Sequence, residues 1–334
     1  MNSLVALLLC TLLATTARAA TPCSNLPGWF AESRSGIDLA NFNPFPTTAA
    51  PRTLVPVVEY TCDLWYDDYT DKTWDLPDQL FPPQEVPGSA TAAVGFAVSS
   101  TIAMHEAFNE QMSISSCGLF SCSSASASYA EAAGFMYNKS MAFGAMASRI
   151  SSYSLKMAPP IPSAPLAMDP RAFAYYDAYV GGDPTLNATT KANYDRFVEL
   201  VGTHYLNESM WGGWAMSTFE TQRTAFDAHG SEAVAGEAKA AFLNCIHGDG
   251  GGGASGSVAA WFTDASSVEA ALFFGGKGTP TDPASFAAWS ASVSEVPYLT
   301  SFTAVPISEL LPTPEQRGNM SLYIQDRLDR ALVN

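Results

Sequence analysis

The feature that most constrains the fold is the stretch YDRFVELVGTHYLNESMWGG, which runs from Tyr194 to Gly213. Its first half has the apolar spacing of an amphipathic helix. A Gly-Thr-His-Tyr block stands at the end of that helix, and a Gly-Gly pair closes the stretch. Taken by itself, this arrangement suits either a catalytic histidine or a mechanical hinge.

A catalytic role for His204 needs partners at workable spacing, and the sequence offers none. His105 and Glu106 begin like a zinc-protease motif, but Asn109 stands where the second histidine is required. The GASGS block at 253–257 does not fit the nucleophile elbow of a hydrolase, and no phosphate loop or dinucleotide fingerprint follows a strand. We therefore expect no enzymatic activity, no metal and no cofactor.

The N-terminus has the pattern of a secretory signal. Residues 1–19 run apolar and then turn small, with an A-x-A cleavage motif, so the mature chain is expected to cover residues 20–334. Beyond the signal, no stretch reaches the roughly 18 consecutive apolar residues that a membrane-spanning helix needs. We expect a secreted, extracellular protein that leaves the cell in soluble form.

Sequons and cysteines agree with export. N-x-[ST] sites accept glycans on the surface of secreted proteins, and here they are Asn138, Asn187, Asn207 and Asn319. Cysteines in an oxidising compartment mostly pair, and the candidates after cleavage are Cys23, Cys62, Cys117, Cys122 and Cys245. Their odd number leaves one free or joined to another chain. A short-loop pairing of Cys117 with Cys122 is one option, and the connectivity stays open.

Charge and size limit the partners. The net charge of -16 argues against nucleic acid and gives no electrostatic attraction to anionic lipid. A hydrophobic content of 47% in a chain of this length indicates globular packing, either as one large core or as two smaller domains.

Periodicity predicts the elements before the central stretch. We expect a strand at residues 54–62, and a long strand or strand pair with a helical interruption over residues 92–118. Residues 123–129 alternate small polar and small apolar types, which is typical of a strand. Residues 130–148, rich in Ala and Met, are predicted to be helical, and residues 149–159 alternate like another strand.

Helix signals dominate the later part. Asp169 as N-cap and Pro170 at the first helical position predict a helix that ends near Gly181. The helix that follows carries one apolar face, formed by Tyr194, Phe197, Val198 and Val201. Further on we expect a helix over 231–246, a mobile Gly-rich turn over 247–257, a buried strand over 268–276 and a terminal helix over 316–334.

The pattern Y-x6-V-G-T-H-Y-x6-G-G, from Tyr194 to Gly213, is similar to the signature of the membrane attack complex/perforin (MACPF) family. Other motifs of that family occur in the same order along the chain. They are GIDL, LPD, FSCSSASASY and YSLKM before the pattern, and FFGG, Trp289 and VPISELL after it. The family usually has an aromatic residue before Gly-Thr-His, and Val201 takes that place here. The resemblance covers residues 35–334.

The resemblance implies an α+β fold of the MACPF/cholesterol-dependent-cytolysin type, in a single domain over residues 20–334. Its expected core is a bent, twisted antiparallel sheet of four long strands, flanked by two helical clusters that rearrange into amphipathic hairpins and insert into membranes. A hairpin of two transmembrane strands needs at least about 22 to 25 residues. Residues 119–148 and 224–267 are both long enough to be these inserting segments.

Two sets of site residues follow from the resemblance. The expected signature and hinge residues are Tyr194, Gly202, Thr203, His204, Tyr205, Gly212, Gly213, Gly275 and Gly276. The expected membrane-inserting residues are Ser124, Ser126, Ser128, Tyr129, Phe135, Met136, Val258, Trp261 and Phe262. In the structural interpretation, Thr203 and His204 hydrogen-bond where a helix meets the third long strand, and the glycines let the sheet bend. Insertion is only weakly encoded, because the Ala and Ser faces of the first segment differ little and the second segment is rich in Gly.

The function implied is that of a secreted perforin-like pore-forming protein acting on target membrane lipid. Open sheet edges cannot remain in hydrocarbon, so it would assemble as a homo-oligomer, a ring or an arc, and become membrane-associated. Because the chain ends soon after the expected final helix, a separate membrane-targeting protein or the N-terminal region would supply targeting. The alternative is a non-lytic extracellular MACPF protein working in adhesion, matrix or signalling.

Overall fold

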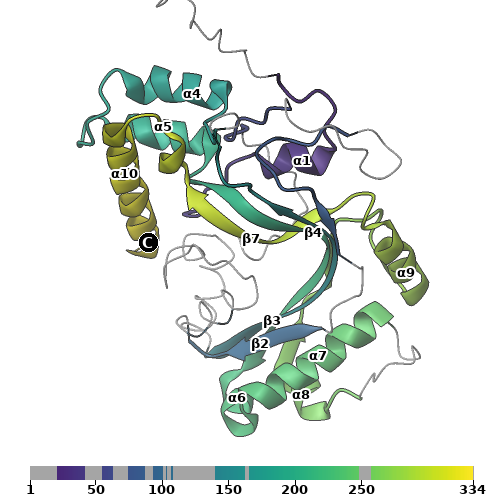
Figure 1. Ribbon diagram of the computed structural model, residues 1–334. Helices are drawn as coiled ribbons and strands as arrows, with labels where there is room; N and C mark the ends of the chain where they lie inside the picture. The colour runs from purple at the N-terminus through teal and green to yellow at the C-terminus, as the bar shows by residue number, and fades with distance from the viewer. Residues whose placement is uncertain are drawn as a thin grey trace, which may run out of the picture.

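The computed structural model describes residues 21–41, 55–62, 74–86, 93–100, 103, 107, 140–161, 165–247 and 257–333, and every structural statement below concerns these residues. Their main feature is a long antiparallel sheet that bends partway along its length (Figure 1). Helices pack at both ends of the sheet and beside the bend.

Two long strands form the centre of the sheet. They are β3 (Met141–Lys156) and β4 (His204–Gln222), which pair antiparallel along most of their length. Next to β3 lie β1 (Gln84–Glu85) and β2 (Val94–Val98), and next to β4 lie β5 (Ser266–Val268), β6 (Leu272–Phe274) and β7 (Tyr298–Pro306). The short strands follow one another along each edge, so the sheet is four strands wide. The predicted α+β fold with a bent antiparallel sheet is confirmed. The expectation of four long strands is met only by β3 and β4, because shorter strands make up both edges in the described residues.

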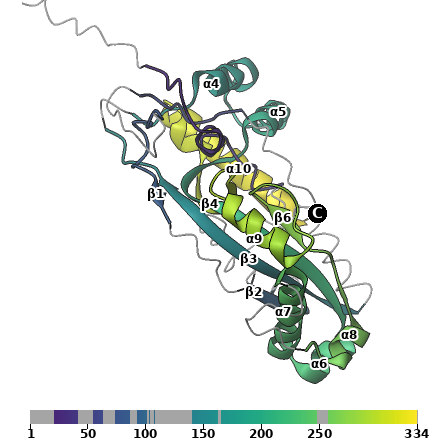
Figure 2. The same ribbon diagram turned by 90° about the vertical axis from the view of Figure 1, so that its right-hand side faces the viewer.

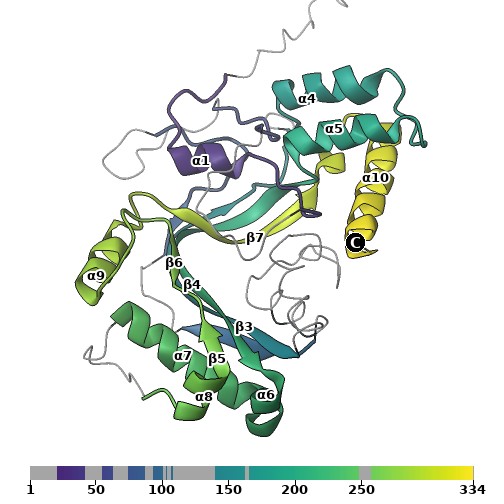
Figure 3. The same ribbon diagram turned by 180° about the vertical axis from the view of Figure 1, so that it is seen from behind.

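The helices fall into groups at the ends of the sheet. In chain order they are α1 (Gly28–Ser33), α4 (Pro170–Tyr176), the π-helix η1 (Asp177–Gly181), α5 (Lys191–Val201), α6 (Arg223–His229), α7 (Ser231–His247), α8 (Ala260–Ala265), α9 (Pro283–Ser292), the 3₁₀-helix η2 (Ile307–Leu310) and α10 (Pro314–Val333). Figures 1 and 3 show α4, α5 and α10 together at one end, α6, α7 and α8 at the other, and α9 beside the bend.

Local signals placed several helices correctly. The Asp169 side chain accepts a hydrogen bond from the Arg171 N–H, and Pro170 fills the first turn of α4. The predicted apolar face of α5 is fully buried. The Ala-rich helix and the terminal helix are present as α7 and α10.

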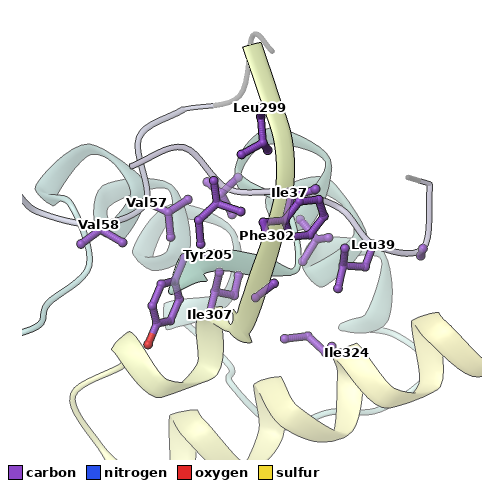
Figure 4. Packing of buried hydrophobic residues seen from close by; sticks show 14 of the residues in the cluster. Ile37, Leu39, Val57, Val58, Tyr205, Leu299, Phe302, Ile307 and Ile324 are labelled. Carbon is purple, nitrogen blue, oxygen red and sulfur yellow. The ribbon is translucent and has the colours of Figure 1, made fainter. Parts of the chain in front are cut away.

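Two hydrophobic clusters pack on opposite faces of the sheet. Along β4, Trp214 and Met216 belong to the larger cluster, whereas Ala215 and Phe219 belong to the second. Side chains of successive strand residues point to opposite faces, so β4 is buried on both. Figure 4 shows part of the larger cluster, with Ile37, Leu39, Val57, Val58, Tyr205, Leu299, Phe302, Ile307 and Ile324 labelled.

The strand predicted at residues 54–62 is wrong. Within 55–62 the chain makes isolated bridges instead, with Pro56 opposite Ser35 and Val58 opposite Met168. Proline has no N–H to donate, so Pro56 interrupts a continuous ladder.

The helix predicted over 130–148 is wrong for residues 141–148, which belong to β3. This part of β3 pairs with β4 on one side and with β2 on the other, and that pairing overrides the helix propensity of Ala and Met. The strand expectations are confirmed at 94–98 and 149–156, and the strand predicted over 268–276 is present at 272–274. The predicted strand at 123–129 lies outside the described residues.

One disulfide joins Cys23 to Cys62, across a sequence separation of 39 residues. The disulfide links the segment before α1 to residues 55–62, which form bridges with Ser35 and Met168. Cys117 and Cys122 lie outside the described residues. Cys245 lies in α7, but its side chain is not among those described, so its pairing stays a prediction.

Candidate functional site

The candidate site is the bend of the sheet, where Gly212 and Gly213 occupy the middle of β4. Here the partner of β4 on one edge changes, because Gly212 pairs with Tyr298 of β7 whereas Trp214 pairs with Phe274 of β6. Register shifts interrupt both ladders nearby, between Ser151 and Tyr153 of β3 and between Met210 and Trp211 of β4. Bulges of this kind bend a strand and increase its twist, so the bend is built into the backbone.

Neither glycine of the pair has room for a side chain in the present packing. A Cβ atom at Gly212 would lie 1.8 Å from the carbonyl oxygen of Ile150 on the neighbouring strand. At Gly213 the obstacle is α9 and the residue after it, since a Cβ atom would lie 2.5 Å from Val293 Cγ2 and 3.0 Å from the ring of Trp289. Gly212 thus permits the close approach of two strands, and Gly213 permits the close approach of a helix.

Trp289 of α9 connects the two predicted glycine pairs. Its Nε1 donates a hydrogen bond of 2.6 Å to the carbonyl of Gly275, and a Cβ atom at Gly276 would lie 2.7 Å from its ring. Gly275 and Gly276 have φ values of 74° and 67°, a backbone region that favours glycine. Trp289 is fully buried and touches Phe273 edge to face. From the sequence, Trp289 was identified only as one of the motifs shared with the family. Its contact with Gly213 depends on tertiary structure.

A second junction lies where α5 meets β4. Gly202 ends α5 with a φ of 84°, and a Cβ atom there would lie 2.6 Å from the Ile37 nitrogen. The Thr203 hydroxyl accepts a hydrogen bond from the Leu39 N–H at 3.0 Å and donates one to the Ile37 carbonyl at 3.1 Å. The GIDL segment, residues 36–39, is therefore held against the Gly-Thr-His block.

His204 is a buried part of this junction. Its Nδ1 forms a hydrogen bond of 2.8 Å with Thr203 Oγ1. Burial lowers the pKa of His204 to about 4, although the charge of Asp38 acts in the opposite direction. The imidazole is thus neutral at pH 7 and packed in the interior, which is the environment of a structural residue.

Ionic contacts fasten this junction to the C-terminal helix. Arg327 of α10 pairs with Asp38 at 2.7 Å and with Asp195 at 3.2 Å, and the first pair is nearly buried. Burial opposes the charge of Arg327, but its hydrogen bond and attraction to Asp38 outweigh burial and raise its pKa. Tyr323 donates to Asp195 at 2.6 Å and stacks on Tyr194 with ring centroids 5.0 Å apart.

The helices α6, α7 and α8 cover the far end of the sheet and belong to the second predicted inserting segment. Phe262 is buried and meets Phe219 of β4 edge to face, with ring centroids 5.9 Å apart. Trp261 stacks on His229 at 3.8 Å, and Val258 packs partly buried on the same cluster. The other predicted inserting residues, namely Ser124, Ser126, Ser128, Tyr129, Phe135 and Met136, lie outside the described residues.

The connections before β3 and after β4 leave the sheet at the same end. Val98, the last residue of β2, pairs with Phe143, and Met141, the first residue of β3, pairs with Gln222, the last residue of β4. Beyond α6, α7 and α8, the chain returns to β4 as β5. Four strand ends therefore lie side by side at this end of the sheet (Figure 3).

The predicted glycan acceptors differ in exposure. Asn187 is exposed, and its Oδ1 accepts from the Thr190 N–H. Asn207 and Asn319 are partly exposed, and Asn138 lies outside the described residues. Occupancy of these sites stays a prediction.

Neither a spanning helix nor a metal cluster is found in the described ranges. Their helices are too short or too polar to cross a membrane. In the same part of the chain, no three side chains of His, Cys, Asp or Glu gather closely enough to hold a metal ion.

Comparisons with known proteins agree on one family. A family model described as MAC/Perforin domain matches residues 34–333. The perivitellin-2 67 kDa subunit of Pomacea canaliculata is 29% identical over 280 residues, which are 83% of this chain and 47% of the relative, and the same subunit of Pomacea maculata gives the same values. The chain thus spans about half the length of the curated relatives it matches. GNIP1Aa from Chromobacterium piscinae has a similar fold, with a TM-score of 0.63 and 13% identity over 93% of this chain and 57% of that chain.

Proposed function

We propose a function on the premise that this chain belongs to the MAC/Perforin (MACPF) family and is a perforin-like protein. The proposed function is that of a secreted protein that forms pores in membranes. It acts without catalysis, assembling as a homo-oligomer on target lipid. Each protomer inserts two β-hairpins into the wall of a shared barrel. The observation that carries the proposal is the common end of the sheet at which the chain leaves β2 and enters β3, and leaves β4 and enters β5. Residues 141–148 of the first candidate segment already belong to β3, so the part of it that is free to insert ends before Met141.

The register at that end supports direct elongation of the sheet. Thr221 of β4 pairs with Ser266 of β5, so residues 223–265 are the connection of an antiparallel strand pair. This connection is longer than the roughly 22 to 25 residues that two transmembrane strands and a turn require. If the helices unfold, the same two strands can continue without any change of register.

The residues of the connection alternate between charged and apolar types, as the wall of a β-barrel requires. Continuing the period of two from β4 places nearly all charged or titratable residues of α6 and α7 on one face: Arg223, Asp227, His229, Glu237 and Lys239. The other face receives Phe226, Val234, Ala238, Ala240 and Phe242, and its polar residues are Thr224, Glu232 and Asn244. One face therefore suits lipid and the other a watery lumen.

The apolar residues of α7 serve both states because of their spacing. Val234, Ala238, Phe242 and Ile246 are fully buried against the sheet and recur every four residues. A spacing of four keeps side chains on one face of a helix, with 3.6 residues per turn, and on one face of a strand, with a period of two. The side chains that hold the helix on the sheet would thus face lipid in the hairpin.

Assembly is required by the same physics. A hairpin inserted alone would leave unpaired N–H and C=O groups in hydrocarbon, so several protomers must close a barrel. An exposed apolar residue, Val268, lies on the edge strand β5, where a neighbouring protomer could add. The relatives are named as a subunit of perivitellin-2, which supports a second protein chain as a partner.

The alternative is a non-lytic extracellular MACPF protein in adhesion, matrix or signalling. It is favoured by the returning half of the connection, where the run from Gly250 to Gly253 offers no side chains to lipid. Such a protein would use the same fold as a rigid module and would bind a ligand without opening the sheet.

A matched pair of lysine substitutions tests the proposal. Ala240 and Ala241 are neighbours in α7 with similar partial burial, but the strand period puts Ala240 on the lipid face and Ala241 on the lumen face. Lysine on the lipid face of a barrel costs about 2–4 kcal/mol at the midplane. Dye release from phosphatidylcholine–cholesterol vesicles, with and without phosphatidylserine, should fall at least about tenfold for Ala240→Lys and stay near wild type for Ala241→Lys.

Electron microscopy of the same vesicles supplies the second readout. Rings or arcs accompanied by release support the pore. Tight binding of a ligand without release from any vesicle would contradict pore formation and favour the non-lytic alternative. Equal loss in both lysine variants would contradict the assigned faces.

A further inference from the structure

The short helix α1 lies against the bend through one aromatic side chain. The ring of Trp29 stacks on Tyr153 of β3, with centroids 4.6 Å apart and planes inclined by 15°, and its centroid lies 6.0 Å from that of Trp211. Tyr153 and Trp211 are register partners, and each adjoins a register shift beside Gly212. Trp29 therefore contacts the two strands at the point where both are irregular.

The same tyrosine reaches toward α9. Its hydroxyl donates a hydrogen bond of 3.1 Å to the carbonyl of Ser294, just beyond α9 and next to Val293, which packs on Gly213. A chain of contacts thus runs from α1 through Tyr153 to the segment that covers the bend. Figure 2 shows α1, α9 and α7 following one another along the sheet.

The body of the protein fixes α1 on its other side. Phe30 is fully buried in the larger cluster, and Ser33 Oγ lies 3.0 Å from the Tyr60 hydroxyl. Arg34, directly after the helix, forms a nearly buried ion pair of 2.9 Å with Asp169. The Cys23–Cys62 disulfide fixes the segment directly before the helix. Trp29 is thereby anchored from behind.

We propose that residues 23–35 form a brace, in which Trp29 positions the bend and the disulfide keeps α1 in place, so that release of this stack sets how readily the sheet opens. Opening the sheet changes the relation between β3, β4 and α9, and these three elements meet at Tyr153. The brace deepens the proposed function and rests on it for its role in membrane attack. Its effect on the bend can nevertheless be measured without a membrane.

Trp29 is a favourable residue for the test because it is only partly buried. A pocket of about 390 Å³ lies between Glu32 of α1 and the glycine turn, and Gly276 and Tyr298 are among the residues that line it. Trp29→Ala should therefore leave the core and the fold intact. Trp29→Phe retains an aromatic ring and should restore most of the contact with Tyr153.

The matched control is another stacked pair far from the bend. Tyr175 and Tyr179 stack with centroids 6.4 Å apart and planes inclined by 14°, and Tyr175 is exposed. Tyr175→Ala removes a wider stacked contact at the α4 end of the molecule. A double change, Cys23→Ser with Cys62→Ser, tests the tether separately from the ring.

Hydrogen exchange of the lipid-free full chain gives the first readout. For Trp29→Ala we expect amide exchange over residues 210–214 and 298–301 to rise about three- to tenfold, the factor given by the loss of one aromatic stack. The disulfide variant should change in the same direction, Trp29→Phe should change little, and Tyr175→Ala should leave these amides as in the wild type. Dye release from vesicles should accelerate by the same factor in Trp29→Ala and in the disulfide variant.

The outcomes separate the two proposals. Unchanged exchange at the bend in Trp29→Ala, or an equal change in Tyr175→Ala, would overturn the brace, whatever the vesicles show. Faster exchange at the bend with no release from vesicles by any variant, wild type included, would uphold the brace and overturn pore formation. Release by the wild type that is not accelerated in Trp29→Ala would overturn the role of the brace in opening.

Discussion

One methyl group, added at either of two adjacent glycines, is expected to have very different costs. At Gly212 the new Cβ atom would lie 1.8 Å from the Ile150 carbonyl oxygen, which is part of the β3 backbone. Carbon and oxygen atoms of neighbouring strands normally approach to about 3.3 Å, so β3 and β4 would have to separate by about 1.5 Å. Ladder hydrogen bonds near the bend would break, with a predicted cost of about 3–6 kcal/mol.

At Gly213 the obstacles are side chains rather than backbone. The new Cβ atom would lie 2.5 Å from a methyl group of Val293 and 3.0 Å from the Trp289 ring. A rotamer change of Val293 costs about 0.5–1.5 kcal/mol. Burial of the added methyl group returns about 0.8 kcal/mol, so Gly213→Ala should lose about 1 kcal/mol or less. The contact between β4 and α9 is loosened, while the strand pairing survives.

Guanidinium unfolding of the two purified variants, followed by circular dichroism, measures the difference. We expect Gly212→Ala to be less stable than Gly213→Ala by at least about 2 kcal/mol, or to be lost during secretion because natural domains have only about 5–15 kcal/mol in total. Gly213→Ala should be secreted and should release vesicle dye at least as fast as the wild type. Equal unfolding free energies for the two variants, or a more stable Gly212→Ala, would refute this account of the bend.

Three further predictions concern buried polar contacts. Trp289→Phe should cost about 1–2 kcal/mol, because the carbonyl of Gly275 loses its donor, and thermal unfolding of the purified protein would show it. Burial lowers the pKa of His204 to about 4, below its unfolded value of about 6.5. The stability that neutral His204 contributes is therefore complete above pH 6.5 and declines by up to about 3 kcal/mol as the pH falls to 4. His204→Gln should reduce this pH dependence of the unfolding free energy, measured at pH 7 and pH 5. Arg327→Met should cost about 3–5 kcal/mol because two carboxylates lose a nearly buried partner, whereas Arg330→Met, at an exposed pair, should cost no more than about 1 kcal/mol by the same denaturation assay.

Local signals in the sequence were sufficient for the helices near the central stretch. The cap at Asp169 and the apolar face of α5 are set by residues within a few positions of one another, and both are found as expected. The same reasoning failed at residues 141–148. Their strand conformation depends on pairing with 215–222 of β4, and no local pattern carries that information.

The candidate site shows the same division. Gly212, Gly213, Gly275 and Gly276 could be singled out because glycine pairs mark close approaches or unusual backbone. That Gly213, Gly275 and Gly276 meet at Trp289 depends on α9 folding back onto β4, which the sequence does not display. The stack of Trp29 on Tyr153 was missed for the same reason, because the two residues are distant in the chain and each is ordinary alone.

The junction around Gly202 and Thr203 has a consequence for the order in which the chain folds. Thr203 bonds to Ile37 across a separation of 166 residues, and Asp38 pairs with Arg327 across 289. Contacts of such high sequence separation form slowly, and the second cannot form until α10 has been synthesised. During translation the contacts of the GIDL segment therefore form in two stages, those with Thr203 first and the ion pair of Asp38 with Arg327 last. A nascent chain that ends before residue 203 should leave this segment open to protease, and full protection should require the release of α10.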